Sequence, residues 1–461
     1  LTVATASVYL IARFSPFTQL QRTLLAFGYF NLYEYAVISR SYALGVFFVF
    51  LFCSLYGRYQ TQLAAGNMAW NALILPFGVL GLLANTSVYG LFLSGALSIA
   101  LLWPLTRQRL SVGWFWGGMG WLWLSWLTCY LQIKRVDSSF SVGSLPGVRM
   151  VNDAPTWRLP TERVLDTGAH VWRSYVPIPE FWRDAFWGGN ALLDSHHLPA
   201  IAELQVGKIL AFLLSLVLVS AVVRVLWYRP KWLCVYAAGT VVHLLFSYFF
   251  FGGFLRHHGH LFILLVACLW LANTDDSTGS LSQPADRVSM TWSKLREAQT
   301  WLDPLSSQWQ KSFLTGLLSC QVLAGVMAYS TDFSQPFSAS RMTADYLRSH
   351  QLDHLTILGY RDRQAATLSG YLSKQIYYPN RQAFGSFWEL EQDIPQAELV
   401  TQIQAFVSRS EQPVVLALTE ALEQPIPNLT LQPLATLKGK VVVDETFYLY
   451  LASPPGLEFN L

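Results

Sequence analysis

The stretch GGFLRHHGHLFILLVACLWL (252–271) decides the fold class of this chain. Most of it belongs to an apolar segment, 257–273, that is close to the roughly 20 residues needed to cross a bilayer. One arginine and three histidines gather at the start of that segment: Arg256, His257, His258 and His260. Ionisable side chains are costly beside a membrane span, so such a cluster points to function.

Similar apolar runs recur from the first residue to about residue 330. The 461 residues are 53% hydrophobic and only 13% charged, against about 25% charged in soluble proteins. The pattern predicts a mainly α-helical, polytopic membrane bundle of about ten spans. We expect them at 1–13, 20–39, 42–57, 70–84, 86–104, 112–131, 207–227, 231–252, 257–273 and 311–329. A net charge of only +3 argues against a nucleic-acid partner.

The membrane region is therefore expected over 1–330, with a long loop at 132–206. The short cytoplasmic loops of multi-pass membrane proteins carry more Lys and Arg than the loops on the other side. Among the short loops of this chain, alternate ones hold nearly all of these residues, and the other short loops hold only Arg40 and Arg256. This predicts a multi-pass membrane protein with the long loop and the C-terminal region on the outer face.

Residues 331–461 have the composition of a soluble domain and predict an α/β fold. Helical periodicity is expected at 339–352 and 364–373, and strands at 355–360, 375–379, 413–418 and 440–452. The region has no glycine-rich phosphate loop and no nucleophile motif. It therefore favours a packing or recognition module over a second active site.

Within the long loop, 170–194 mixes Trp and Phe with charged residues. This suits a helix lying in the membrane interface. Such a helix could form a lid or a platform for a lipid substrate, or could simply anchor the loop.

Three polar clusters are expected on the outer face: Glu34 with Arg40, Asn85 at a break between apolar runs, and the cluster from Arg256 to His260. Together they predict a cavity that binds an anionic lipid headgroup, because Arg and His donate to phosphate oxygens. Alternatives stay open, since Glu34 could pair with Arg22 or Arg40, and Arg40 could snorkel to headgroups. The spacing of the histidines does not place two imidazoles on one helical face, which disfavours a metal site.

Three stretches resemble the GT-C superfamily of polytopic membrane glycosyltransferases, which includes protein O-mannosyltransferases and aminoarabinose transferases. They are YFNLYEYAVISRSYALGVFFVFLFCSLYGR (29–58), LGLLANTSVYGLFLSGALSIALL (80–102) and the 252–271 stretch. The first matches an acidic turn followed by Arg-x-Tyr-Ala-Leu, here Arg40, Tyr42, Ala43 and Leu44. The second matches a span that opens with a Thr/His-Tyr-Gly-Leu pattern, here Thr86, Tyr89, Gly90 and Leu91.

The resemblance implies inverting transfer of a sugar from a polyprenyl-phosphate donor to an outer-face acceptor, which could be a lipid, a glycan or a protein. The substrate-binding residues that we expect are Arg40, Tyr42, Asn85, Arg256, His257, His258 and His260. In that superfamily the catalytic carboxylates lie in the first outer loop, so we expect the general base on a segment upstream of Leu1, with Glu34 a lesser candidate. No cofactor is expected with certainty, although a divalent cation could assist. Two other functions fit the composition: a lipid or oligosaccharide transporter (flippase), and a non-catalytic membrane scaffold.

Overall fold

The computed structural model describes residues 1–38, 41–64, 70–103, 112–134, 161–180, 189–193, 206–277, 290–388, 394–422, 424–439 and 445–456. The chain divides into two compact units. The first comprises Leu1–Asp137, Gly147–Glu180 and Gly188–Tyr329, and the second contains Ser330–Leu461.

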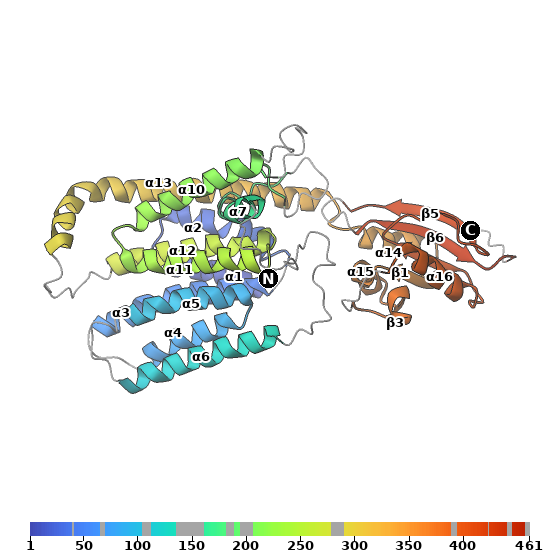
Figure 1. Cartoon of the computed structure of the whole chain (residues 1–461), viewed down its shortest axis with the longest axis horizontal. Helices are drawn as coiled ribbons and strands as arrows, with labels where there is room; N and C mark the ends of the chain where they lie inside the picture. Colours follow the sequence, from blue (N-terminus) through green and yellow to red (C-terminus); the bar gives the residue numbers. More distant parts are fainter. Residues whose placement is uncertain are drawn as a thin grey trace. The chain divides into compact units, whose positions relative to one another are not determined.

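The first unit is a helical bundle (Figure 1). A helix bonds its backbone N–H and C=O groups internally, as a lipid environment requires. In chain order the helices are α1 (Thr2–Phe14), α2 (Gln19–Ala26), the π-helix η1 (Phe30–Glu34), α3 (Tyr42–Ala64), α4 (Trp70–Ala84), α5 (Val88–Leu102), α6 (Val112–Lys134), α7 (Thr161–Gly168), α8 (His170–Tyr175), α10 (Val206–Leu226), α11 (Pro230–Phe249), α12 (Leu255–Ser277) and α13 (Met290–Ser334).

Five helices in the described part of the chain are long and apolar enough to cross a bilayer, which indicates a membrane protein. They are Tyr42–Gln62, Val206–Leu226, Pro230–Phe249, Leu255–Asp275 and Gln308–Ser334. Three shorter apolar helices cover Thr2–Phe14, Ile74–Ala84 and Val88–Leu102. The expectation of about ten spans is therefore not confirmed, because the apolar runs at 1–13, 70–84 and 86–104 form helices shorter than a membrane span.

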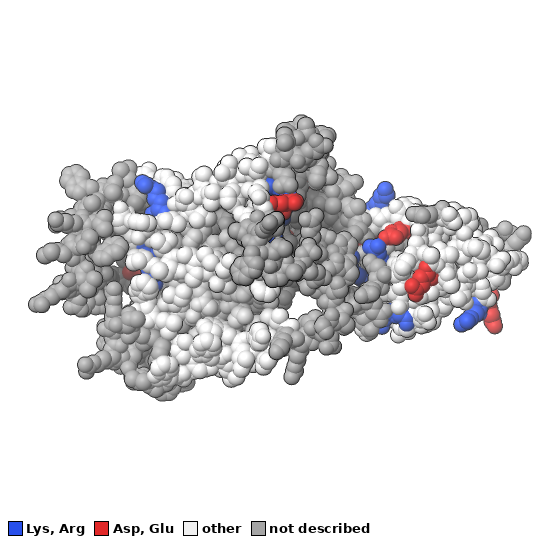
Figure 2. Space-filling view, in the orientation of Figure 1, with Lys and Arg blue, Asp and Glu red and all other residues white. Residues whose placement is uncertain are grey.

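Helix α12 is the central helix of the bundle. In its most apolar segment 94% of α12 is buried inside the protein, whereas the corresponding share is 22–44% for the other four long apolar helices. It packs against α3, α5, α8 and α11. A Cβ built on Gly239 of α11 would lie 2.6 Å from Leu264 Cδ2 of α12, so glycine permits this close approach. Charged side chains are sparse on the visible described face of the bundle (Figure 2), as expected for a surface facing lipid.

The expected span at 20–39 is not one continuous helix. Helix α2 starts with a capping box between Thr18 and Gln21 and ends at Ala26. The Gln21 amide donates to the Lys311 carbonyl and to Thr315 Oγ1, both at 3.1 Å, which fixes α2 against α13. The π-helix η1 follows after the break, and such turns often occur at functional positions.

Helix α8, in the described part of the long loop, packs inside the bundle. Val171, Ser174 and Tyr175 of α8 are buried. The backbone N–H of Trp172 donates to Ser215 Oγ of α10 at 2.9 Å, and the hydroxyls of Tyr175 and Tyr236 are 2.9 Å apart. Helix α8 therefore does not lie exposed in the interface plane, as the aromatic pattern led us to expect. Phe181, Trp182, Phe186 and Trp187 lie outside the described residues.

The second unit is an α/β domain. Its sheet has the strand order β3-β2-β1-β4-β6-β5. The strands are β1 (Thr356–Tyr360), β2 (Ile376–Tyr378), β3 (Ala383–Gly385), β4 (Val414–Leu418), β5 (Thr430–Leu437) and β6 (Phe447–Ser453), and the helices are α14 (Ser340–Ser349), α15 (Asp362–Leu372), the 3₁₀ turn η4 (Pro379–Arg381) and α16 (Gln396–Val407). Strand β1 pairs in parallel with β2 and β4, and β6 pairs antiparallel with β4 and β5.

The sheet is covered on both faces. One core contains Ala365 and Leu368 of α15 with Ile357 of β1, and the other contains Leu399 and Ile403 of α16. The expected segments at 339–352, 355–360, 364–373, 375–379 and 413–418 correspond to α14, β1, α15, β2 and β4. The 440–452 strand starts only at Phe447, and residues 440–444 lie outside the described ones. Strands β3 and β5 and helix α16 were not predicted.

Candidate functional site

The first turn of α12 carries a concentration of polar side chains. Gly253 precedes it with a φ of 78°, which favours glycine, and the Gly252 carbonyl accepts from His258 Nε2 at 2.8 Å. The backbone N–H of Phe254 donates to His257 Nδ1 at 2.8 Å. His257 therefore caps the helix, and its Nδ1 bears no proton.

This hydrogen bond fixes the tautomer of His257. Because Nδ1 accepts, Nε2 holds the proton and donates to the hydroxyl of Tyr42, 2.9 Å away. The imidazole is neutral in this arrangement and ties the start of α3 to the start of α12.

Two further tyrosines join the same cluster from other elements. Tyr35, which directly follows η1, donates to the Arg256 carbonyl at 2.8 Å and lies 3.4 Å from His260 Nδ1. Tyr89 of α5 stacks on His257 and His260, each with a centroid separation of 5.1 Å. We call Tyr35, Tyr42, Tyr89, Arg256, His257 and His260 the α12 entrance cluster. Segments far apart in the sequence thus meet around one helix terminus.

A second group of histidines lies beside this cluster. The rings of His170 of α8 and His258 stack with centroids 3.7 Å apart. The ring centroids of His243 of α11 and Tyr89 are 4.9 Å apart. Burial, with His258 and then Arg173 close by, lowers the pKa of His170 well below its usual value. His170 is therefore neutral at physiological pH.

Several polar atoms in this region are buried and have no hydrogen-bond partner among the described residues. They are Tyr89 Oη, His170 Nδ1, His243 Nε2, His258 Nδ1 and His260 Nε2. The His260 Nδ1 lies 3.0 Å from the His257 carbonyl and donates to it, so Nε2 carries a lone pair. Buried polar atoms without partners are rare in folded proteins and point to a ligand or ordered water.

The structure separates the other candidates. Glu34 is buried, and its Oε2 accepts from Tyr29 at 2.9 Å. Arg22 does not pair with Glu34, because its guanidinium donates to the carbonyls of Ala12, Ser15 and Phe17. Arg40 lies outside the described residues, so its expected role stays a prediction.

Asn85 faces a different part of the bundle from the α12 entrance cluster. Its amide donates to the carbonyls of Gly81 and Ser125 at 3.0 and 3.2 Å, and its Oδ1 accepts from Thr128. These contacts hold α4 against α6. Its side chain is thus occupied by packing contacts instead of facing the histidines.

The sequence analysis did not place Tyr35 or His170 in the expected site. Tyr89 appeared only within the resemblance. No local pattern links His170 to His258, because their contact depends on the loop folding back into the bundle. Within the described residues, no group of three or more His, Cys, Asp or Glu side chains could hold a metal ion.

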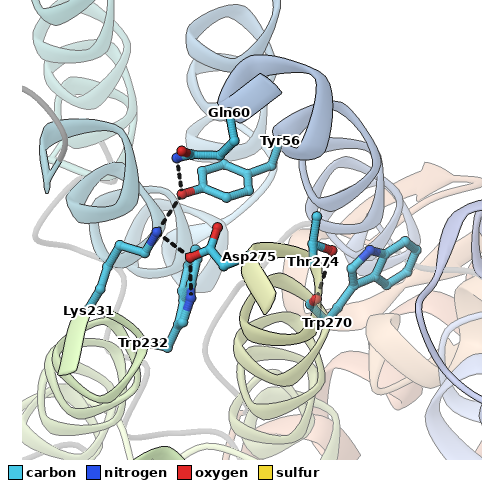
Figure 3. Close-up of polar contacts among 7 residues, drawn as sticks. All are labelled: Tyr56, Gln60, Lys231, Trp232, Trp270, Thr274 and Asp275. Carbon is cyan, nitrogen blue, oxygen red and sulfur yellow. Dashed lines mark hydrogen bonds and ion pairs between the residues drawn. The ribbon is translucent and has the colours of Figure 1, made fainter. Parts of the chain in front are cut away.

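The opposite end of α12 holds a second polar cluster, on α3, α11 and α12 (Figure 3). Lys231 lies 2.5 Å from Asp275 Oδ2 and donates to the Tyr56 hydroxyl at 2.8 Å, and Trp232 Nε1 donates to Asp275 at 2.9 Å. Gln60 also donates to Tyr56. The charged and polar groups of this cluster have partners, which indicates a structural role. We call Tyr56, Gln60, Lys231, Trp232 and Asp275 the structural clasp.

Neither a protein-family model nor a curated protein nor a solved structure was found to match this chain.

Proposed function

We propose that this chain is a membrane glycosyltransferase that takes a sugar from a polyprenyl-phosphate donor and passes it to an acceptor at the outer face of a bacterial inner membrane. The observation that supports this most is the α12 entrance cluster, in which tyrosine and histidine side chains surround the first turn of a buried helix. The proposal also rests on the resemblance of the same stretches to GT-C enzymes.

The first turn of α12 suits a phosphate for two reasons. A helix N-terminus carries a partial positive charge and favours anions. The half-buried Arg256 guanidinium lies there, 4.6 Å from the Phe254 ring centroid, and adds a planar fork of donors. Both features would stabilise the negative charge that develops on the lipid phosphate as it leaves.

An inverting transfer also needs a base that takes the acceptor proton. Among the described residues, Glu34 is a buried carboxylate in the turn that places Tyr35. It is a candidate for this role. The His260 Nε2 lone pair offers another acceptor in the cluster.

The proposed topology places α1, α4, α5 and α6 in the membrane beside the five longer helices, which would approach the predicted ten spans. The excess of Lys and Arg in alternate short loops supports a topology in which the N-terminus of α12 lies at the outer face of the membrane. The same rule would place the C-terminal domain on the outer face.

The test is release of polyprenyl phosphate from mannosyl-, glucosyl- and aminoarabinosyl-phosphate polyprenols by the purified chain in nanodiscs, with a cell-envelope extract as acceptor source. We expect Arg256→Ala to lower kcat by about 10²–10³-fold, the effect of removing one group that stabilises developing charge. Arg224→Ala, on α10, is the matched charge control and should leave the rate within about twofold, because distant surface changes have small effects.

Three results would contradict the proposal. They are absence of release from all donors, equal rates for Arg256→Ala and wild type, and movement of the lipid across the bilayer without sugar transfer. The last would favour the transporter alternative.

A further inference from the structure

The C-terminal domain has a feature that the proposed transferase site does not use. Strand β1 is followed by α15, which packs on one face of the sheet and leads to β2. Strand β4 lies on the other side of β1 and is preceded by α16, which packs on the opposite face. The strand order therefore changes direction between β1 and β4, with α15 and α16 on opposite faces, and ligands of open α/β sheets bind at the carboxyl ends of the strands at such a switch point.

The N-terminus of α15 lies directly at this edge. Its N-cap residue is Arg361, and no side chain caps the helix there. Arg363 follows in the first turn beside the buried Asp362, so the positive end of this helix carries side chains of both signs. Arg361 forms an ion pair with Glu420, which comes directly after β4, and the backbone of Thr419 donates to the Tyr360 carbonyl at 3.0 Å.

Polar atoms without partners gather at the same edge. The amide nitrogen and oxygen of Gln364, in the first turn of α15, are both buried and have no hydrogen-bond partner among the described residues. The same holds for the hydroxyl of Tyr378 at the end of β2 and that of Thr419 beyond β4. Gln364 is 2% exposed and Tyr378 is fully buried.

These groups belong to one place. Tyr378 ends β2 beside the end of β1, and Asp362 in the first turn of α15 is close enough to contribute to a raised pKa of Tyr378. The Tyr378 side chain therefore lies on the face of the sheet that α15 covers, in the same core as Ala365 and Leu368. Leaving buried polar groups without partners is costly, so such a group of them in one region calls for an external partner.

We propose that the carboxyl edge of β1, β2 and β4 is a binding site for a sugar phosphate. The α15 N-terminus and Arg361 would take the phosphate. A phosphate dianion offers only acceptors, whereas the Gln364 amide and the two hydroxyls need both donors and acceptors, which sugar hydroxyl groups supply. Since these atoms are shielded in the chain as it stands, ligand entry must open this edge locally.

The experiment is isothermal titration of the full-length chain in detergent with glucose 1-phosphate, inorganic phosphate and glucose. We expect glucose 1-phosphate to bind more tightly than either component alone. Arg361→Ala should weaken its binding by at least about tenfold, the loss expected for a charge-assisted hydrogen bond. Arg409→Ala is the matched control, because Arg409 is an exposed arginine just after α16, at the amino edge of β4, and this variant should bind like wild type.

Gln364→Leu separates a ligand contact from a structural role. If the amide contacts the sugar, this variant should bind glucose 1-phosphate no more tightly than inorganic phosphate. Its melting temperature without ligand should not fall, because the substitution removes a buried amide that lacks partners.

A second arm identifies the source of the ligand. Nanodiscs with a glucosyl-phosphate polyprenol should compete with glucose 1-phosphate if the site takes a lipid headgroup, and should not compete if it takes a free sugar phosphate. Absence of saturable binding, or equal losses for Arg361→Ala and Arg409→Ala, would overturn the proposal. Arg256→Ala should leave this binding intact, so its outcome is independent of the transferase test.

Discussion

Replacing Gly259 with alanine tests whether the α12 entrance cluster depends on close packing. Gly259 lies on α12 opposite η1. A Cβ at this position would sit 2.3 Å from Phe30 Cε1 and 2.5 Å from the Tyr35 hydroxyl oxygen. Both contacts are far below van der Waals separation, so Phe30 and Tyr35 must move.

The expected cost can be worked out from these contacts. Overpacking a filled core costs about 1–3 kcal/mol. Displacing Tyr35 also breaks its hydrogen bond to the Arg256 carbonyl, worth about 1 kcal/mol. Alanine gains about 1 kcal/mol over glycine in helix propensity. Gly259→Ala should therefore lower the free energy of unfolding by about 1–3 kcal/mol, since the helix gain offsets only part of the loss.

The assay is the melting temperature of the purified chain in detergent, followed by tryptophan fluorescence, together with donor turnover. Gly95→Ala in α5 is the matched control, because nothing lies within 4 Å of a Cβ built there. We expect the control to melt at or above the wild-type temperature. A Gly259→Ala variant with unchanged stability and turnover would refute the close packing of α12 against η1.

Two further predictions concern other parts of the chain. Burial raises the pKa of Tyr378 to about 12; Asp362 adds a smaller increase, and Arg381 opposes it. The ordinary pKa of a tyrosine is about 10. As the pH rises, Tyr378 therefore loses its proton in the unfolded chain before it does so in the folded chain. The stability from this group is therefore complete below about pH 10 and declines toward pH 12. Tyr378→Phe should show a smaller fall in melting temperature over that interval than wild type, and an identical fall would contradict the burial of the phenol. In the structural clasp, Lys231→Ala and Asp275→Ala should each cost about 1–3 kcal/mol by leaving the partner unpaired, and the double variant should cost less than their sum in a thermal-unfolding cycle. Strict additivity would show that the two side chains do not interact.

Much of the local structure followed from the sequence. The long apolar runs at 42–57, 207–227, 231–252, 257–273 and 311–329 correspond to helices of spanning length, because length and apolar character are properties of one segment. The strands at the centre of the C-terminal sheet were also predictable, since their short apolar runs are bounded by turns.

Positions at the sheet edge were harder to predict. Strand β5 is largely exposed and contains Pro433, so it lacks the apolar alternation of the inner strands. Similarly, the short strand β3 is largely exposed. Local pattern carries little information where a strand buries few side chains.

Sequence alone determined that this chain has an apolar helical region, an α/β region, and an arginine with histidines at the start of one span. Only the tertiary structure decided that Tyr35, Tyr42 and Tyr89 surround that start, that Asn85 packs elsewhere, and that His170 stacks on His258. The physical reason is that helix formation depends on neighbouring residues and their solvent, whereas these contacts depend on which helices pack together. That choice is made by shape and by close approach at residues such as Gly259, which no periodicity records.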